Sequence, residues 1–336
     1  MSFEPANPVE PKSTPNVLDK PVMRGRPGRL APEQSARITR RITLLAVAIG
    51  MFLAIGKVFV YKATGSVGIL SSLVHSSLDL VGAISTFAAV RYAARPPDGA
   101  YRFGRGKAES FSAVFQVCLI IFAASHLLEE AWERMISPEP ITQSGFAIAA
   151  MLTFIAITIW LLIAQSWAIR ATGSVAIRGD RAHYLADLLG NIVVIFGLVM
   201  TRYTPFERAD AIVGILMALW LLYTAYRVAH IAWAQLLDRE LPESERDMIK
   251  ALALQDPRVR SVNDLRTRAS GPHIHIQMRL DLDESLSLSD AHDIVLSAEK
   301  RMMSAYQAAD ILIHPHPVGC LATHGNVRFR SDHTHN

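Results

Sequence analysis

A histidine and an aspartate recur four residues apart at two places in this 336-residue chain. The first pair, His75 and Asp79, lies in ATGSVGILSSLVHSSLD, and the second, His183 and Asp187, lies in ATGSVAIRGDRAHYLAD. Residues four apart share one face of an α-helix, so each pair presents an imidazole beside a carboxylate. Two such pairs supply two nitrogen and two oxygen ligands, a set that suits tetrahedral Zn²⁺.

The two segments are related copies. Aligned at an offset of 108 residues, residues 63–84 and 171–192 are identical at 11 of 22 positions. A single HxxxD spacing is a weak signal, because one pair could be a buried His–Asp hydrogen bond that ties two helices together. The duplication favours one shared metal site over two separate structural pairs.

Long apolar stretches carry both copies. The chain is 51% hydrophobic and 19% charged, with a mean hydropathy of +0.24. Runs of about 20 apolar residues are long enough for a helix to cross a bilayer. Six such spans are predicted, at 42–61, 67–93, 110–133, 145–169, 182–202 and 210–234. A soluble all-helical core is the alternative, but soluble helices keep a polar face, and residues 145–169 include no charge.

Charged residues inside these spans indicate function. An ionised carboxylate at membrane depth costs about 2.5–3.5 kcal/mol on insertion scales, so Asp79 and Asp187 are expected to serve a site. Lys57, in the first span, is expected to extend its ammonium toward the membrane surface. Spans two and five run in opposite directions by parity. The copies therefore form an inverted repeat, which in many transporters holds the substrate site near the midplane.

Basic residues are unequally distributed among the predicted loops. Arg and Lys concentrate in the N-terminal tail and in the loops after spans two and four. The positive-inside rule predicts that both termini are cytoplasmic. The cell (inner or plasma) membrane is the expected location. The net charge of +4 follows from this topology. The basic tail lacks interleaved aromatic residues, so no nucleic-acid partner is expected.

Four regions are expected along the chain. Residues 1–40, with seven prolines, are predicted to be a disordered basic tail, and 41–235 a six-helix transmembrane domain. Residues 236–320 are predicted to be a small cytoplasmic α/β domain of order α-β-β-α-β, and 321–336 a disordered, histidine-containing tail. The segment HIHIQMRLDLD alternates strictly, which indicates a half-buried strand with His273 and His275 on its polar face.

Together with the paired motifs, several further segments make the chain resemble the cation diffusion facilitator family over about residues 40–320. These segments are YRFGRGKAES, LLDRELPE, VNDLRTRASGP and ILIHPHP. The resemblance implies a polytopic membrane protein of six helices with a metallochaperone-like, ferredoxin-like cytoplasmic domain. It also implies a homodimer that exports divalent metal against inward proton flow, with the transport site formed by His75, Asp79, His183 and Asp187.

The residue at position 75 bears on the choice of metal. Family members carry Asp or His there, and imidazole in place of a carboxylate favours Zn²⁺ over Mn²⁺. We expect a Zn²⁺/H⁺ antiporter, because metal and protons compete for the same ligand atoms. Export of Fe²⁺, Co²⁺, Cd²⁺ or Mn²⁺ stays open, as does a metal sensor or scaffold that does not transport.

A membrane metalloenzyme is a third class, and the sequence argues against it. HExxH is absent, and a closed four-ligand site leaves no position for a reacting water. No organic cofactor is expected.

The resemblance also implies metal binding by the cytoplasmic domain. The histidines at matching positions are His292, on the second helix, and His314 and His316, at the end of the last strand. We expect one three-ligand site per protomer, which regulates the carrier or stabilises the dimer. Asn263 and Arg279 occupy positions where relatives carry histidine, so a binuclear site is not expected.

Two further features lie in predicted loops. At the family's loop site, Tyr101 and Arg105 replace histidines and Asp98 remains, so no metal is expected there. Lys107 and Asp238 both fall near the predicted cytoplasmic membrane surface. They either pair and couple the soluble domain to the spans or are two separate exposed charges.

Overall fold

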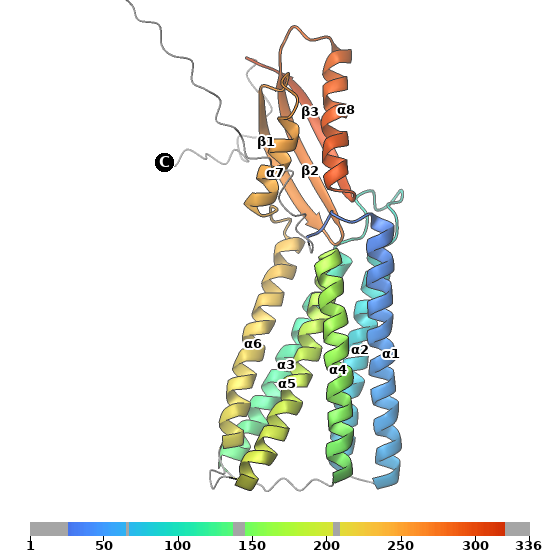
Figure 1. Cartoon of the computed structure of the whole chain (residues 1–336), viewed down its shortest axis with the longest axis vertical. Helices are drawn as coiled ribbons and strands as arrows, with labels where there is room; N and C mark the ends of the chain where they lie inside the picture. Colours follow the sequence, from blue (N-terminus) through green and yellow to red (C-terminus); the bar gives the residue numbers. More distant parts are fainter. Residues whose placement is uncertain (1–25, 65–66, 137–144, 204–208, 320–336) are drawn as a thin grey trace, which may run out of the picture. The chain divides into compact units, whose positions relative to one another are not determined.

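The computed structural model describes residues 26–64, 67–136, 145–203 and 209–319 (Figure 1). The chain divides into two compact units. The first comprises Met1–Leu241, Thr267–His275 and Ala305–Asp310, and the second comprises Pro242–Arg266, Ile276–Ser304 and Ile311–Asn336. All of the predicted C-terminal tail and most of the predicted N-terminal tail lie outside the described residues.

The first unit holds six long helices. They are α1 (Pro32–Thr64), α2 (Val67–Ala93), α3 (Ala108–Ile136), α4 (Gly145–Thr172), α5 (Val175–Tyr203) and α6 (Ala209–Leu236). The shortest, α2, has 27 residues, and at 1.5 Å per residue it is about 40 Å long, which exceeds a hydrocarbon core of about 30 Å. Within the described ranges, four stretches are apolar enough to cross a membrane: Pro32–Phe59, Ala108–Glu133, Ile155–Thr172 and Ile212–Leu236. The first unit therefore contains a helical transmembrane domain.

Two helices begin earlier than their apolar runs. α1 begins at Pro32, within the region predicted as a tail, since proline suits a first helical turn and Glu33 complements the helix dipole there. α5 begins at Val175, because Gly173, with φ of 72°, ends α4 and Ser174 caps the next helix. The Ser174 hydroxyl accepts a hydrogen bond from the Ile177 amide at 3.4 Å.

Two apolar clusters hold the bundle together, and α5 belongs to both. One joins α3, α5 and α6 and is rich in alanine: Ala113, Ala124, Ala182, Ala186, Ala225 and Ala232. Small side chains let helix backbones approach closely, which is how helices associate in a membrane. The other joins α1, α2 and α4 to α5 through Tyr184 and Leu188. α5 packs against α2, α3, α4 and α6, and Figure 1 shows it between α4 and α6, so side chains on α5 can meet those of most other helices.

The remaining elements have the order that the sequence predicts. They are α7 (Glu243–Ala253), β1 (Ser261–Ser270), β2 (His273–Leu282), α8 (Leu288–Ala305) and β3 (Ala309–Pro317). The sheet order is β1-β2-β3, and Gly271, with φ of 58°, turns β1 into β2. β3 runs parallel to β2, because the Ile274 amide bonds to the Ala308 carbonyl and the Val318 amide to that of Leu282. The αββαβ fold is confirmed.

One residue of β2 departs from the predicted alternation. The apolar face is buried as expected, but His275, placed on the polar face, is only 6% exposed. Its Nδ1 lies 2.9 Å from Asp310 Oδ2, and its ring packs edge-on against Phe103 with centroids 5.7 Å apart. A polar residue can therefore be buried on this face, because contacts outside the strand cover it.

Candidate metal centre

Three potential metal ligands meet inside the helix bundle. Asp79 of α2 and His183 and Asp187 of α5 each offer one ligand atom, and these atoms all lie within 4.8 Å of one another. His183 Nε2 is 2.9 Å from Asp79 Oδ1 and 3.8 Å from Asp187 Oδ2. The structure thus brings together residues from both copies of the repeat, 104 positions apart.

The spacing of these atoms fits a small tetrahedral ion. Ligands about 2.0–2.1 Å from Zn²⁺ in tetrahedral geometry lie about 3.3 Å apart, between the two distances observed. His183 is 2% and Asp79 8% exposed, and Asp187 is partly buried. A buried pair of carboxylates is costly unless cations or hydrogen bonds compensate it, so this cluster is suited to a divalent cation.

The fourth predicted ligand lies one helical turn from Asp79. Residue 75 belongs to α2, but the side chain of His75 lies outside the described residues. Its place in the site rests on helical spacing, since residues four apart share one face. The four-ligand set stays a prediction.

A buried polar network, which sequence reasoning missed, holds α5 one turn from His183. Asp180 is 1% exposed, and its carboxylate accepts hydrogen bonds from Gln165 Nε2 at 2.7 Å and Gln116 Nε2 at 3.2 Å. Gln116 Nε2 also donates to Thr86 Oγ1 at 3.1 Å. The network therefore links α2, α3, α4 and α5. The available signal was a single glutamine within each of two apolar spans, Gln116 in 110–133 and Gln165 in 145–169.

Two glycines make room for this network. A Cβ at Gly82 of α2 would lie 3.0 Å from Gln116 Nε2, and one at Gly179 of α5 would lie 3.1 Å from Ala113 Cα. Both distances are shorter than ordinary contacts, so side chains at these positions would crowd α3 against the two site-bearing helices.

Tyr184 fixes α5 against α1. Its hydroxyl donates to the Ala46 carbonyl at 3.2 Å, and its ring lies edge-on beside that of His183, with centroids 6.2 Å apart. At the start of α5, the buried carboxylate of Glu109 accepts a hydrogen bond from the Ser174 hydroxyl. Neighbouring helices thus set both the position and the register of the helix that carries two of the ligands.

Lys107 and Asp238 lie together within the first unit. Lys107 Nζ is 3.0 Å from Asp238 Oδ2 and 3.1 Å from the Leu236 carbonyl oxygen. Arg268 Nη1 also lies 3.1 Å from the same carboxylate oxygen. Asp238 has φ of 54°, an uncommon conformation for a residue with a side chain. These contacts join the start of α3 to the end of α6.

The three histidines proposed to bind metal in the cytoplasmic domain do not form a three-ligand cluster in the described structure. His314 and His316 have ring centroids 6.3 Å apart, and His292 is exposed on α8. Across the described ranges, only the cluster at Asp79 brings three potential ligands within 4.8 Å. The three-histidine site stays a prediction.

Asn263 and Arg279, the positions at which the family resemblance implies histidine, take part in a hydrogen-bond network. Asn263 Nδ2 donates to Asp281 Oδ2 at 2.6 Å, and Arg279 Nε donates to Asp281 Oδ1 at 3.2 Å. His316 Nδ1 lies 3.7 Å from the same carboxylate. The Asp281 carboxylate is therefore hydrogen-bonded to Asn263 and Arg279, whereas His316 lies within ion-pair range of it but beyond hydrogen-bonding distance.

In the loop after α2, the Asp98 carboxylate is paired with Arg105 and accepts a hydrogen bond from the Tyr101 amide at 2.9 Å. The Arg105 side-chain hydrogen bond, followed by that amide, lowers the pKa of Asp98. Arg105 thus supplies the cation that pairs with this carboxylate.

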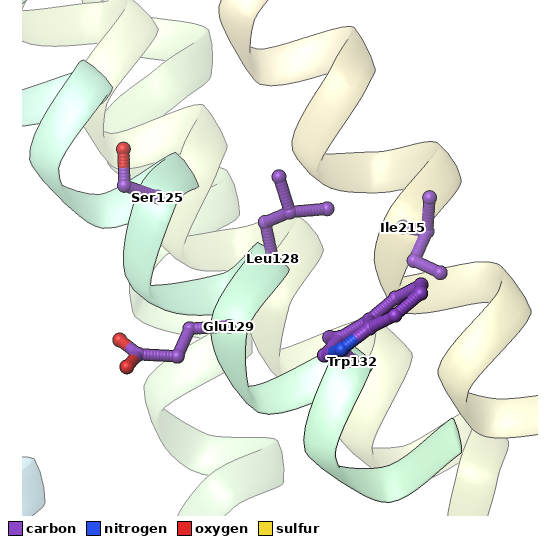
Figure 2. A pocket seen from close by; sticks show the side chains of 5 residues that line it. All are labelled: Ser125, Leu128, Glu129, Trp132 and Ile215. Carbon is purple, nitrogen blue, oxygen red and sulfur yellow. The ribbon is translucent and has the colours of Figure 1, made fainter. Parts of the chain in front are cut away.

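A groove of about 550 Å³ lies elsewhere on the bundle, between α3 and α6. Figure 2 shows Leu128, Trp132 and Ile215 along it, with Ser125 and Glu129 on α3. Asp79, His183 and Asp187, the described ligands of the metal centre, do not line this groove, which is mainly apolar.

Sequence profiles match almost the whole described chain. The profile described as "Cation efflux transmembrane domain" matches residues 43–237, and "Cation efflux protein, cytoplasmic domain" matches residues 241–318.

Curated relatives cover the same region. The chain is 36% identical over 284 residues to the cation-efflux pump FieF of Serratia proteamaculans, covering 84% of this chain and 94% of that protein. It is 34% identical over 289 residues to the pump of the same name in Escherichia coli K12, covering 86% and 96%.

Among solved structures, one titled "Mode of Action of a Putative Zinc Transporter CzrB (Zn form)" is 27% identical. It covers 24% of this chain and 94% of that chain with a TM-score of 0.24. The metal-bound C-terminal domain of CzcD from Thermotoga maritima is 28% identical, with 24% and 99% covered and a TM-score of 0.23.

Proposed function

This chain belongs to the cation diffusion facilitator family of cation efflux proteins, and on that premise we propose that it is a Zn²⁺/H⁺ antiporter. It is an integral membrane protein for divalent metal efflux. The transport site is formed by His75, Asp79, His183 and Asp187.

The cluster of Asp79, His183 and Asp187 carries this proposal. Its ligand atoms converge inside the bundle from both halves of an inverted repeat. Imidazole nitrogen and carboxylate oxygen in a four-ligand set suit Zn²⁺, whereas larger or harder cations prefer more oxygen ligands.

Exchange for protons follows from the chemistry of the ligands. Imidazole and carboxylate bind metal only when deprotonated, so a proton bound at either group displaces the ion. Rocking of the two halves exposes the site alternately to each side of the membrane. Metal enters from the cytoplasm, and protons taken up on the opposite side release it and return with the carrier.

The rest of the chain serves this cycle. We propose a tail at 1–40, whose residues from Pro32 onward form the start of α1, and a transmembrane domain at 41–235. A cytoplasmic regulatory and dimerisation domain at 236–320 and a second tail at 321–336 follow. Both termini are cytoplasmic, and the protein is a homodimer in the inner membrane. His292, His314 and His316 hold a regulatory ion in each protomer. The matched ranges 43–237 and 241–318 support these boundaries.

Metal-driven proton flux in proteoliposomes tests the proposal. Zn²⁺, Cd²⁺, Fe²⁺, Mn²⁺ and Co²⁺ are compared, with an Asp79→Ala/Asp187→Ala protein as control. We expect the fastest proton movement with Zn²⁺ and none in the control. A faster response to another metal would make the chain an exporter of that metal.

A second candidate is a transport-inactive metal sensor or scaffold. Absence of flux with every metal, from protein shown to be folded and dimeric, would replace the antiporter with that function. The buried carboxylates argue against it, because a sensor has no need of charged groups inside the membrane.

A further inference from the structure

Lys57 lies against the helix that carries Asp79. It is the single charged residue in the apolar stretch 42–60, and α1 packs along α2. Its Nζ lies 2.5 Å from the Ser76 hydroxyl, and Ser76 is 3% exposed. The expectation that Lys57 snorkels to the membrane surface is wrong, since its ammonium points into the bundle.

The two carboxylates that act on this ammonium are those of the candidate metal centre. Burial of Lys57 disfavours its positive charge, and the nearby carboxylates of Asp79 and Asp187 both favour it. Ser76, which holds the ammonium, is three residues before Asp79 and so lies one helical turn from it. Lys57 therefore contributes a positive charge to the site without offering a metal ligand.

This charge alters the balance of the site. Asp79 and Asp187 carry two negative charges, so with the ammonium the metal-free cluster has a net charge of minus one, apart from the histidines. A divalent ion raises that net charge to plus one. Without Lys57, the same ion would only neutralise the carboxylates and would be held more strongly.

We propose that Lys57 is the resident counter-ion of the transport site. Its ammonium compensates Asp79 and Asp187 when no metal is bound, and it repels the bound ion so that the ion can leave. A carrier needs a site that binds its cargo but also releases it. Lys57 thus acts through its charge on the metal ligands: it weakens metal binding and speeds release of the metal. This inference rests on the proposed transport site.

Three variants separate charge from packing. Lys57→Met keeps the length of the side chain and removes the charge, whereas Lys57→Arg keeps the charge. Ser76→Ala removes the hydrogen bond alone. Full-length protein is assayed for the apparent KM and the maximal rate of Zn²⁺ transport in proteoliposomes. Zn²⁺ affinity is measured separately by competition with a chromophoric chelator.

Removal of the charge is expected to lower the KM and the Zn²⁺ dissociation constant by about tenfold, as one repelling unit charge is lost. The maximal rate of Lys57→Met falls, because release slows. The KM and the Zn²⁺ dissociation constant of Lys57→Arg and of Ser76→Ala are expected to be closer to those of the wild type. A purely structural role would instead raise the KM or lower the rate without tighter binding.

An unchanged or weaker Zn²⁺ affinity in folded Lys57→Met would overturn the inference, as would the same effect from Ser76→Ala. The Asp79→Ala/Asp187→Ala protein distinguishes this failure from failure of the transport site itself. If that protein binds Zn²⁺ as wild type does at every site, the proposed function fails. If it loses one site while Lys57→Met does not change affinity, only the role of Lys57 fails.

Discussion

At the level of single residues, the two distances from His183 to the carboxylates lie on either side of the spacing that a bound Zn²⁺ would require. Its Nε2 lies close enough to Asp79 for a hydrogen bond, at 2.9 Å, and farther from Asp187, at 3.8 Å. Insertion of an ion would lengthen the first distance and shorten the second. Side-chain shifts of less than about 1 Å would suffice, since tetrahedral Zn²⁺ sets its ligand atoms about 3.3 Å apart.

The choice of metal is a residue-scale prediction. His75→Asp replaces one imidazole with a carboxylate and gives an oxygen-rich set that suits Mn²⁺ better than Zn²⁺. We expect the ratio of Zn²⁺ to Mn²⁺ transport to fall by at least about tenfold, the usual size of effects at metal sites. Parallel flux assays measure the ratio. An unchanged ratio would remove His75 from the ligand set.

A second residue-scale prediction concerns pH and the cytoplasmic domain. Arg258 hydrogen-bonds the Asp256 carboxylate at 2.8 Å and 3.0 Å and lowers its pKa to about 2. Since the unfolded-state pKa is about 3.9, the ionised form stabilises the fold above about pH 4, and this contribution disappears as the pH falls toward 2. Because Arg258 is half exposed, we expect about 1 kcal/mol.

Hydrogen–deuterium exchange of α7 in the full chain measures this contribution. Asp256→Asn should lower protection at pH 7, and the difference from wild type should shrink as the pH falls from about 4 through about 2. A difference that persists at low pH would show that the carboxylate charge is not its source.

At the level of helices, the sequence predicted which segments form helices and which two helices meet, but not the contacts that fix how they pack. Apolar runs predicted the spans, and the repeat predicted that α2 and α5 meet at the paired motifs. The contacts that set their register could not be predicted. Asp180, Gln116 and Gln165 are far apart in sequence, and their hydrogen bonds depend on how three helices pack rather than on periodicity within one.

The close approach of α3 and α5 predicts that a side chain added between these two helices destabilises the bundle. Gly179→Val would put a side chain 3.1 Å from Ala113 Cα and from Gln116 Cβ, both on the opposing helix. Overpacking of this kind costs about 1–3 kcal/mol. We expect a lower melting temperature in detergent and a large loss of transport, since α5 carries His183 and Asp187.

The matched control is Gly56→Val on α1, where an added Cβ meets nothing within 4 Å. The control should melt and transport much as wild type does. If the two variants behaved alike, the α3–α5 contact would not be what positions the site.

At the level of the whole molecule, the chain combines a helical membrane domain with an αββαβ domain, and composition and alternation predicted both. The sequence did not predict which side chains leave their expected environment. His275 is covered by Phe103 and Asp310, and Lys57 turns inward to Ser76. These contacts join segments that are far apart in the sequence, and no periodicity or motif links those segments.

The pair of Lys107 and Asp238 gives a whole-molecule prediction, because it joins the segment before α3 to the end of α6. Its side chains are about one-third exposed, so we expect a coupling free energy of about 0.2–1 kcal/mol. A double-mutant cycle of Lys107→Ala and Asp238→Ala, followed by thermal unfolding, measures it. Additive effects of the two substitutions would mean that the charges act separately.

The most direct test of the central claim is the coordination of Zn²⁺ in the full-length protein, measured by X-ray absorption. The protein would carry His292→Ala, His314→Ala and His316→Ala, so that the three ligands proposed for the regulatory ion do not contribute. We predict one four-coordinate Zn²⁺ with two imidazoles and two carboxylate oxygens, lost in Asp79→Ala/Asp187→Ala. A six-coordinate ion, or a spectrum that does not change in that variant, would contradict the transport site proposed for this chain.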